Sequence, residues 1–421
     1  MKRRINLIEK YLNTLLVFLI PTQLAIHFWP EFSLLFGIRI DYLAPTIYLT
    51  DLLFVILFVN WSIRNNKVFT KDFIKRKWII IALLLLIVFN TFFSISPVVS
   101  LVKWLKVFEM ILFSYYIYKR KDVYSKNAVG KILLISLCIV SLVGITQFLT
   151  GKTIGGLFYF FGERTFDIFT PGIALVNLFG NNFLRVYSTF PHPNSLAGFL
   201  GLFFVFFYLD NLKLNKYSRL FGLLLISITF ILTFSLSSFI GILFTLVMLF
   251  LLKRNTNFLM LSNLVFFISF LIGLIFLVSS NKLVNLGLNF SSSSIERIRL
   301  AEVSGKIISE NIFFGTGINT FILSMGNNLT FNNAVWLLQP VHNIFLLLLS
   351  ELGITGVLLI YIVFCLFSKR TDKHKNINSK LVFLSIFFVL ITGSFDHYWL
   401  TIQQNILLLS LIFGISARET S

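Results

Sequence analysis

Long runs of apolar residues alternate with polar segments along the whole chain. Each run is close to the roughly 20 residues that an α-helix needs to cross a bilayer. We therefore expect an all-α polytopic membrane protein, with residues 1–421 forming a single membrane domain. The pattern predicts about twelve transmembrane helices, at residues 8–28, 44–63, 78–95, 98–118, 132–149, 193–211, 220–236, 238–252, 258–280, 342–368, 381–395 and 400–416.

Composition and charge agree with a lipid environment. Of the 421 residues, 57% are hydrophobic and only 13% charged, and the net charge is +19. In a soluble protein this charge would suggest nucleic acid, but here the basic residues cluster in short segments such as 64–77, 119–131 and 369–380. Short basic loops stay in the cytoplasm, so both termini are predicted to be cytoplasmic.

The first apolar run resembles a signal peptide, because Met-Lys-Arg-Arg precedes it. It continues to Trp29, however, with Pro21 inside it and no small-residue cleavage site. We expect a retained first helix.

Two polar segments are much longer than the others, residues 150–192 and 281–341, and both are predicted to lie outside. Functional residues are expected there, because long loops on a rigid scaffold often carry function. The aromatic residues and Gly-Pro turns of the first loop suit a flap at the lipid headgroups. The second is predicted to hold an amphipathic helix from Ile295 to about Asn311, since Ser293 and Glu296 have capping-box spacing.

His342 opens the tenth predicted helix at its outer end, with Asn343 beside it. A neutral imidazole can take a proton from a hydroxyl near pH 7, so His342 is the best general-base candidate. The alternative is an interfacial histidine that anchors the helix end. Glu351 lies about 14 Å deeper along the helix, so we expect it to have a packing or hinge role.

The predicted helix of the second outer loop carries two arginines with different surroundings. Arg299 begins a series of alternating charges, at spacings of three and four, that predicts salt bridges along one helix face. Arg297 has no acidic residue on its own face within a turn towards the C-terminus, so its guanidinium is free to bind an anion. The alternative for Arg297 is a solvated surface arginine.

Two other groups of polar residues lie at predicted outer helix ends. Arg185, His192 and Asn194 precede the sixth helix, where an interfacial turn with an asparagine cap is the alternative to a binding site. Asp396 and His397 lie in the short last outer loop. Topology places them near enough to join His342, but the sequence alone does not decide whether they do.

Lys103, Lys106 and Glu109 share one face of the fourth predicted helix. Charged residues at this depth should face the bundle rather than lipid. They form either a buried ion pair or part of an anion pocket.

The usual means of holding a nucleotide sugar or a metal are missing from the sequence. There is no Asp-x-Asp motif, no glycine-rich phosphate loop and no Cys/His ligand set, and Cys138 and Cys365 lie inside apolar runs. We therefore expect no metal, no cofactor and no nucleic-acid partner, and a sugar donor that is not a nucleotide. A glycan on a polyprenyl diphosphate is the standard activated alternative outside the cytoplasm.

Several motifs resemble those of the bacterial O-antigen ligase and Wzy-type O-antigen polymerase family. Val-His-Asn-Ile-Phe-Leu at 341–346, followed by Ser-Glu-Leu-Gly-Ile-Thr-Gly at 350–356, is similar to the signature helix of that family. Arg297 ahead of Phe-Phe-Gly-Thr-Gly at 313–317, and the Arg-to-His-Pro-Asn stretch at 185–197, also resemble family motifs. The resemblance extends through the tail to Gly414.

The resemblance implies a metal-independent membrane glycosyltransferase that moves a glycan from undecaprenyl diphosphate to an acceptor hydroxyl of a glycan or lipid-glycan. By position, it assigns catalytic roles to His342 and Arg297. Where the family often has Thr-x-Ser-Arg, residues 233–236 read Thr-Phe-Ser-Leu. One cation is thus missing at Leu236, so either Arg185, Arg299 or Lys103 replaces it or the activity differs.

Two other classes of function are compatible with a polytopic protein. A flippase or transporter of lipid-linked glycans should show inverted repeats and broken midplane helices in both halves, and the sequence has no such symmetry. A non-catalytic component of a polysaccharide export complex is favoured by Leu236. Ligase and polymerase share these motifs, so both remain open.

Overall fold

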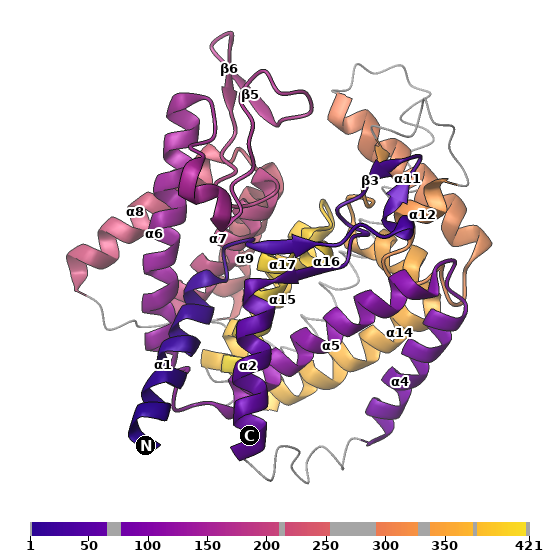
Figure 1. Ribbon diagram of the computed structural model, residues 1–421, viewed down its shortest axis with the longest axis horizontal. Coiled ribbons are helices and arrows are strands. Elements are labelled where there is room, and N and C mark those ends of the chain that lie inside the picture. The colour runs from indigo at the N-terminus through magenta and orange to yellow at the C-terminus, as the bar shows by residue number, and fades with distance from the viewer. Residues whose placement is uncertain are drawn as a thin grey trace.

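The protein is described by a computed structural model that covers residues 2–64, 77–209, 215–252, 292–326, 337–373 and 377–417. Within these ranges it is mostly helical (Figure 1). The longer helices are α1 (Lys2–Leu19), α2 (Leu49–Arg64), α4 (Lys77–Phe92), α5 (Pro97–Lys119), α6 (Lys126–Thr150), α7 (Pro193–Leu209), α8 (Lys216–Leu232), α9 (Leu236–Leu252), α11 (Ser292–Glu310), α14 (Ile344–Lys373), α15 (Ile377–Gly393) and α17 (Gln403–Ser416).

The predicted apolar runs within these ranges all contain helices, whereas the run at 258–280 lies outside the described residues. Two helical stretches, Lys126–Thr150 and Ile344–Leu366, are long and apolar enough to cross a membrane. Other apolar helical stretches, such as Pro193–Phe207 and Gln403–Ser416, are shorter. A helical membrane architecture is supported, while the number of spans and the side of each terminus stay predictions.

The first predicted helix is shorter than expected. It ends at Leu19, and the chain then forms strand β1 (Ala25–His27), so the predicted end at residue 28 was wrong. Pro21 follows the helix immediately, and a proline has no amide hydrogen with which to continue it. β1 pairs antiparallel with β4 (Thr46–Tyr48). The segment that connects them in sequence contains a second antiparallel pair, β2 (Leu34–Leu35) and β3 (Ile38–Arg39).

The first long loop is built from short elements rather than a helix. It contains the 3-10 helix η2 (Gly156–Phe161) and an antiparallel hairpin of β5 (Leu175–Leu178) and β6 (Asn181–Leu184). In Figure 1 the hairpin projects from the same end of the molecule as α11. In the second loop, α11 begins at Ser292, so Ser293 lies inside the helix and is not the predicted cap. Three further short helices are η1 (Glu31–Ser33), α12 (Phe321–Gly326) and α16 (Tyr398–Thr401).

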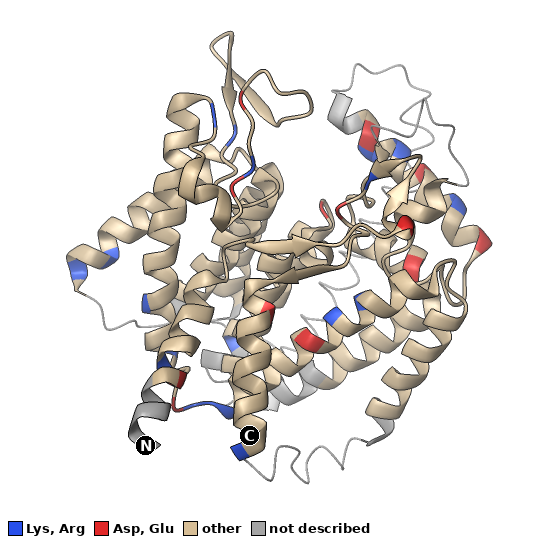
Figure 2. Cartoon of the chain, in the orientation of Figure 1, with Lys and Arg blue, Asp and Glu red and all other residues tan. Residues whose placement is uncertain are grey.

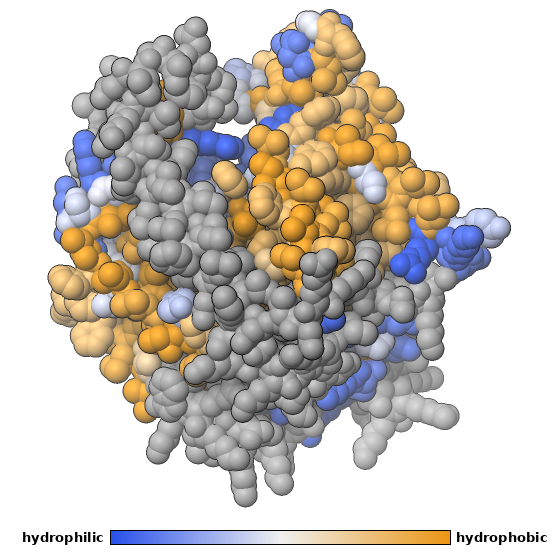
Figure 3. Space-filling model, turned by 180° about the vertical axis from the view of Figure 1, so that it is seen from behind, coloured by the Kyte–Doolittle hydropathy of each residue, from blue (hydrophilic) through white to orange (hydrophobic). Residues whose placement is uncertain are grey.

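The helices pack around one large apolar core and smaller separate ones, and they leave apolar side chains on the outside. α5 packs against α17, α6 against α8, and α15 against both α7 and α9. Large exposed apolar residues include Leu84, Val88, Leu224 and Leu243, and orange side chains cover much of the described surface in Figure 3. Charged residues lie mainly near helix ends and in loops, with groups along α5 and α11 as exceptions (Figure 2). This distribution suits a surface in contact with lipid.

α14 is interrupted at Gly353, whose φ of 64° and ψ of −174° are not helical. The interruption is filled by residues 312–317, which exchange backbone hydrogen bonds with it. The amides of Ile354 and Thr316 donate to the carbonyls of Ile312 and Ser350 at 2.8 and 2.9 Å. Backbone groups freed at membrane depth must find such partners, because lipid offers none.

The buried Asn90 of α4 holds residues 312–317 against α14. It uses all of its side-chain hydrogen-bonding groups to do so. Its amide nitrogen donates to the carbonyls of Glu351 and Phe314 at 2.8 and 3.1 Å. Its oxygen accepts from the Trp104 indole and the Ile318 amide at 3.1 and 3.0 Å. The Phe-Phe-Gly-Thr-Gly motif at 313–317 is thus packed against α14.

We predict that Gly353→Ala destabilises the fold strongly. An added Cβ would lie 2.3 Å from the Phe313 carbonyl oxygen, at a positive φ that L-residues rarely adopt. The control is Gly172→Ala, where φ is +79° but nothing lies within 4 Å. We expect the control to cost only the backbone strain, about 1–2 kcal/mol. Gly353→Ala should cost more than about 3 kcal/mol, measured as unfolding in detergent. Equal losses would show that the contact with Phe313 is unimportant.

Candidate functional site

His342 lies immediately before α14, at the edge of a small cavity of about 240 Å³. Its ring centroid is 5.1 Å from that of His397, which precedes α16. His192 and Asp396 line the same cavity. The structure therefore brings together three histidines and a carboxylate from three separate parts of the sequence.

Asp396 is buried and lies at the centre of this group. Its Oδ2 accepts a hydrogen bond from the Asn194 side-chain amide at 2.9 Å, and its Oδ1 accepts one from the His397 backbone amide at 2.8 Å. Oδ1 also lies 3.4 Å from Nδ1 of His342, within ion-pair distance. The two atoms are not aligned as a hydrogen bond, so Nδ1 is a buried nitrogen with no hydrogen-bond partner among the described residues.

Arg185 is connected to Asp396 through Asn194. Its Nη2 donates to Oδ1 of Asn194 at 2.7 Å, and its Nε donates to the Thr233 carbonyl at 2.7 Å. The Asn194 backbone amide donates to Nδ1 of His192 at 3.1 Å. Arg185 and Asn194 are thus held by the fold behind Asp396, without lining the cavity themselves, and Arg185 keeps one guanidinium nitrogen outside these two bonds.

Arg297 in α11 completes the cationic side of the site. Its side chain is half-buried, and its positive charge contributes to lowering the pKa values of Arg185 and His397, after the larger effect of burial. Arg299, two residues further, is exposed. The predicted salt bridges along α11 were wrong: within the described chain, the alternating charges Arg299, Glu302, Lys306 and Glu310 form no ion pair closer than 4.0 Å. Their side chains remain solvated instead.

The electrostatics of the cavity keep the Asp396 carboxylate ionised and the His397 imidazole neutral. Burial alone would raise the pKa of Asp396, but the nearby His342, His397 and His192 hold it well below its usual range. Burial lowers the pKa of His397 to about 3, against the opposing charge of Asp396. At neutral pH the cavity therefore holds a carboxylate next to a neutral His397. Such an anion can stabilise a proton that arrives on His342.

The donor atoms of His342, Asp396 and His397 lie within 4.8 Å of one another, so these residues could hold a metal ion. Part of their capacity is already used within the protein. Both carboxylate oxygens of Asp396 accept hydrogen bonds, and Nδ1 of His397 is 2.8 Å from the Thr401 hydroxyl. A metal would have to use the remaining lone pairs and the second nitrogen of each histidine.

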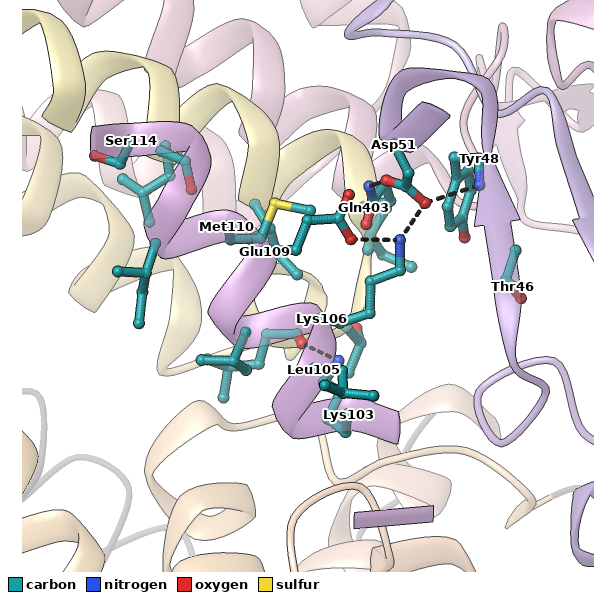
Figure 4. Close-up of a pocket in the computed structure, with 18 of the residues that line it drawn as sticks. Thr46, Tyr48, Asp51, Lys103, Leu105, Lys106, Glu109, Met110, Ser114 and Gln403 are labelled. Carbon is teal, nitrogen blue, oxygen red and sulfur yellow. Dashed lines mark hydrogen bonds and ion pairs between the residues drawn. The ribbon is translucent and has the colours of Figure 1, made fainter. Parts of the chain in front are cut away.

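Lys103 and Lys106 do not reach this cavity. They line a much larger groove along α5, seen in Figure 4. Lys106 forms ion pairs with Asp51 of α2 and, at 3.1 Å, with Glu109. Lys103 donates to the Leu400 carbonyl at 2.8 Å. Of the two predicted arrangements, the ion pair forms between Lys106 and Glu109, but it is only partly buried.

Asn343 and Glu351 are committed to structural contacts. The Asn343 side chain is fully buried, caps α14 by accepting from the amides of Phe345 and Leu346, and donates to the Ser394 carbonyl at 2.9 Å. Glu351 lies beside the interruption of α14, and its Oε1 is 3.4 Å from the Phe321 amide at the start of α12. Neither side chain is among those that line the His342 cavity.

The comparison with known families agrees with the motifs. Residues 221–361 match the model of the O-antigen ligase family. The matched segment is about a third of the chain and is similar to the O-antigen ligase family. No curated protein is significantly similar to the chain. The similarity and the apolar helices together support a membrane protein.

The matched segment, residues 221–361, contains His342 and Arg297, but other residues of the site lie outside it. Arg185, His192 and Asn194 precede the matched segment, whereas Asp396 and His397 follow it. The matched segment has Leu236 at the position where an arginine is expected, three residues after Thr233. The contact between Arg185 and the Thr233 carbonyl therefore bears on how the missing cation is replaced. Arg185 brings a guanidinium to this segment from another part of the chain.

The sequence reasoning missed Tyr42, Arg164 and Gln339, which also line the cavity. Tyr42 lies between β3 and β4, and its ring makes an edge contact with His397 at 5.6 Å. Arg164 follows the aromatic stretch of the first long loop, where a lone arginine beside Phe160 and Phe161 was a usable signal. Nothing in the sequence around Tyr42 indicates such a contact.

We predict that acid destabilises the protein through His397. The pKa is about 3 in the folded state and about 6.5 in an unfolded chain, so the unfolded state binds the proton more readily. Stability is complete above about pH 6.5 and should fall by up to about 1.4 kcal/mol per pH unit below it. His397→Gln should flatten this dependence in thermal unfolding between pH 7 and 5, whereas exposed His27→Gln should not. Identical slopes in all three proteins would contradict the assignment.

Proposed function

We propose that the protein transfers a glycan from a polyprenyl (undecaprenyl) diphosphate carrier to an acceptor hydroxyl, at the outer face of the bacterial cytoplasmic membrane. It would act as a polymerase or ligase of a surface polysaccharide. The observation that carries this proposal is the placement of His342 next to the buried Asp396, to which Arg185 is linked through Asn194. Arg297 is near enough for its charge to lower the pKa values of Arg185 and His397.

The proposed base is His342. Its imidazole takes the proton of the acceptor hydroxyl as the oxygen attacks the anomeric carbon of the donor glycan. The imidazolium that results lies 3.4 Å from the Asp396 carboxylate, which is already ionised. Asp396 therefore stabilises the charge that develops during the step and is a positioning residue for His342.

The proposed leaving group is the polyprenyl diphosphate. As the new carbon–oxygen bond forms, the bond between the anomeric carbon and the diphosphate breaks, and the electron pair goes to the diphosphate oxygen. Arginine matches this charge well, because its planar guanidinium can bind two phosphate oxygens at once. Arg297 has no ion pair within 4.0 Å among the described residues, and Arg185 supplies the cation that is missing at Leu236.

The deciding experiment compares His342→Ala with Asn343→Ala and Asp396→Asn in a purified assay with a polyprenyl-diphosphate-linked glycan. We predict that His342→Ala lowers transfer by about 10²-fold or more, as expected for loss of a general base. Asp396→Asn should lower kcat more than it raises KM, since it acts through His342. Asn343→Ala should affect stability more than turnover. Near-normal transfer by His342→Ala would refute the assignment of the base.

A second prediction separates Arg297 from Arg299, which is the matched control on the same helix. Arg297→Ala should cost about 10²-fold in rate, because one stabilising cation is lost from the transition state, and Arg297→Lys should restore only part of it. Exposed Arg299→Ala should change rate and stability little. If Arg299→Ala is the more damaging at matched expression, the diphosphate lies on the other side of α11.

A third prediction concerns metal ions. Transfer should survive treatment with EDTA, because the proposed step uses His342 and the arginines without a Lewis acid. The measurement is the transfer rate before and after chelation and dialysis. Inactivation that added Mg²⁺, Mn²⁺ or Zn²⁺ reverses would instead assign His342, Asp396 and His397 as metal ligands.

A further inference from the structure

The donor atoms of His342, Asp396 and His397 match the ligand chemistry of zinc. Two imidazole nitrogens and one carboxylate oxygen, all within 4.8 Å of one another, come from the residue ahead of α14 and the turn ahead of α16. Zinc binds such donors in a tetrahedral arrangement, and a site with three protein ligands leaves the fourth position open. Mg²⁺ and Ca²⁺ need about six oxygen ligands, so this set favours zinc over them.

The separation between His342 and Asp396 already suits a shared metal ion. With metal–ligand bonds of roughly 2.0–2.2 Å, neighbouring donor atoms of a tetrahedral site lie about 3.3–3.6 Å apart. Nδ1 of His342 and Oδ1 of Asp396 are 3.4 Å apart. Since no distance within the group exceeds 4.8 Å, His397 would have to shift by no more than about 1.5 Å to complete the set. A small side-chain rotation supplies a movement of this size.

Each of the three side chains has an electron pair to offer. Nδ1 of His342 is buried and has no hydrogen-bond partner among the described residues, a state that a bound metal would relieve. Both oxygens of Asp396 accept one hydrogen bond and keep a second lone pair. Nδ1 of His397 contacts the Thr401 hydroxyl, which leaves its Nε2. Asn194 and Thr401 thereby orient two of the ligands, as the hydrogen-bond partners of metal ligands commonly do.

The cavity gives room for a fourth ligand but also contains opposing charge. Its volume of about 240 Å³ is enough for water on the metal. His192 lines the same cavity, and its Nδ1 already accepts a hydrogen bond from the Asn194 amide. Arg164 lines the cavity as well, although it is half-exposed and 3.3 Å from Asp41. Because positive charge opposes a cation, we expect zinc affinity on the order of micromolar, weaker than that of structural zinc sites.

We propose that Zn²⁺ binds to His342, Asp396 and His397 and reversibly inhibits glycan transfer. A neutral imidazole has one protonated ring nitrogen and one with a free electron pair. Zinc on that pair leaves the His342 ring unable to accept the proton of the acceptor hydroxyl, and it also neutralises the carboxylate that would stabilise the imidazolium. The metal is thus an inhibitor and not a Lewis acid in the transfer step. The inhibition rests on the function proposed above, whereas the binding of the metal does not.

The first test measures binding with Co²⁺, which takes the same ligands as Zn²⁺ and absorbs strongly in the visible region when it is four-coordinate. The full-length protein is purified in detergent, stripped of metal and titrated. We expect one equivalent of Co²⁺ to produce visible bands that Zn²⁺ abolishes and Mg²⁺ does not. Absence of these bands, or only the weak absorption of six-coordinate Co²⁺, would overturn the proposal.

Variants then locate the metal. His342→Ala and His397→Gln each remove a ligand and should weaken Co²⁺ binding by about 10²-fold or more, because even a hydrogen-bond partner of a metal ligand is worth about 10–100-fold in affinity. Thr401→Val keeps all three ligands, should cost about tenfold, and serves if a ligand variant does not fold. His27→Gln is the control, because exposed His27 does not line the cavity. Unchanged binding in the first three variants would place the metal elsewhere and refute the site.

The second test adds Zn²⁺ to the transfer assay. Saturating zinc should lower kcat of the wild-type protein by about 10²-fold or more, as expected when a general base is blocked, and EDTA should restore it. Each variant is compared with itself in the absence of zinc, and His397→Gln should need about 10²-fold more zinc for half-inhibition. Zinc that acts by binding the donor diphosphate would inhibit both proteins equally and contradict the proposal. A rise in rate when zinc is added to metal-stripped protein would also contradict it.

The two tests distinguish failure of this inference from failure of the proposed function. If the protein transfers glycan but Co²⁺ gives no four-coordinate spectrum, the function stands and the metal site is wrong. If Co²⁺ binds through His342 and His397 but no glycan is transferred, the metal site stands and glycosyl transfer is wrong.

Discussion

The candidate site depends on the burial of an ionised carboxylate, that of Asp396. A buried carboxylate is costly unless hydrogen bonds and positive charge surround it. Here those partners come from Asn194, at the start of α7, from the backbone of His397 and from His342 ahead of α14. The contacts that stabilise this one carboxylate therefore fix the relative positions of several helix ends. Arg185 extends the network to the end of α8 through Thr233.

In the proposed reaction, this network would both position the His342 imidazole and stabilise the proton that it accepts. Nδ1 of His342 faces Asp396 without an aligned hydrogen bond, so a proton gained by the ring would have a carboxylate ready to stabilise it. The neighbouring His397 is unsuited to the same role, because burial keeps it neutral down to about pH 3 and Thr401 engages its Nδ1. Two adjacent histidines thus have different chemistry, set by their surroundings.

The interrupted helix α14 is the second constraint on the architecture. Its freed backbone groups bind residues 312–317, and this fixes the C-terminal end of α11 relative to the interrupted part of α14. Arg297 lies near the other end of α11, and His342 lies ahead of α14. The two glycines at the contact, Gly315 and Gly353, have positive φ and would meet backbone atoms within 2.4 Å if they carried a Cβ. The family motifs around them are therefore explained by packing, and Glu351 belongs to this packing rather than to the chemistry.

The sequence by itself determined which segments are helical, where the two long loops lie, and that His342 and Arg297 were candidates. These properties follow from local apolar patterning and from residues close together in the chain. It did not determine the early end of α1, the interruption of α14, the absence of salt bridges on α11, or the assignment of Lys103 and Lys106 to a separate groove. Only the tertiary structure brought Asp396 to His342 and Arg185 to Thr233, contacts that join residues 54 and 48 positions apart. The reason is physical: hydropathy reports how each segment meets lipid, whereas a buried charge selects its partners from whatever the packing of distant helices places within a few ångströms.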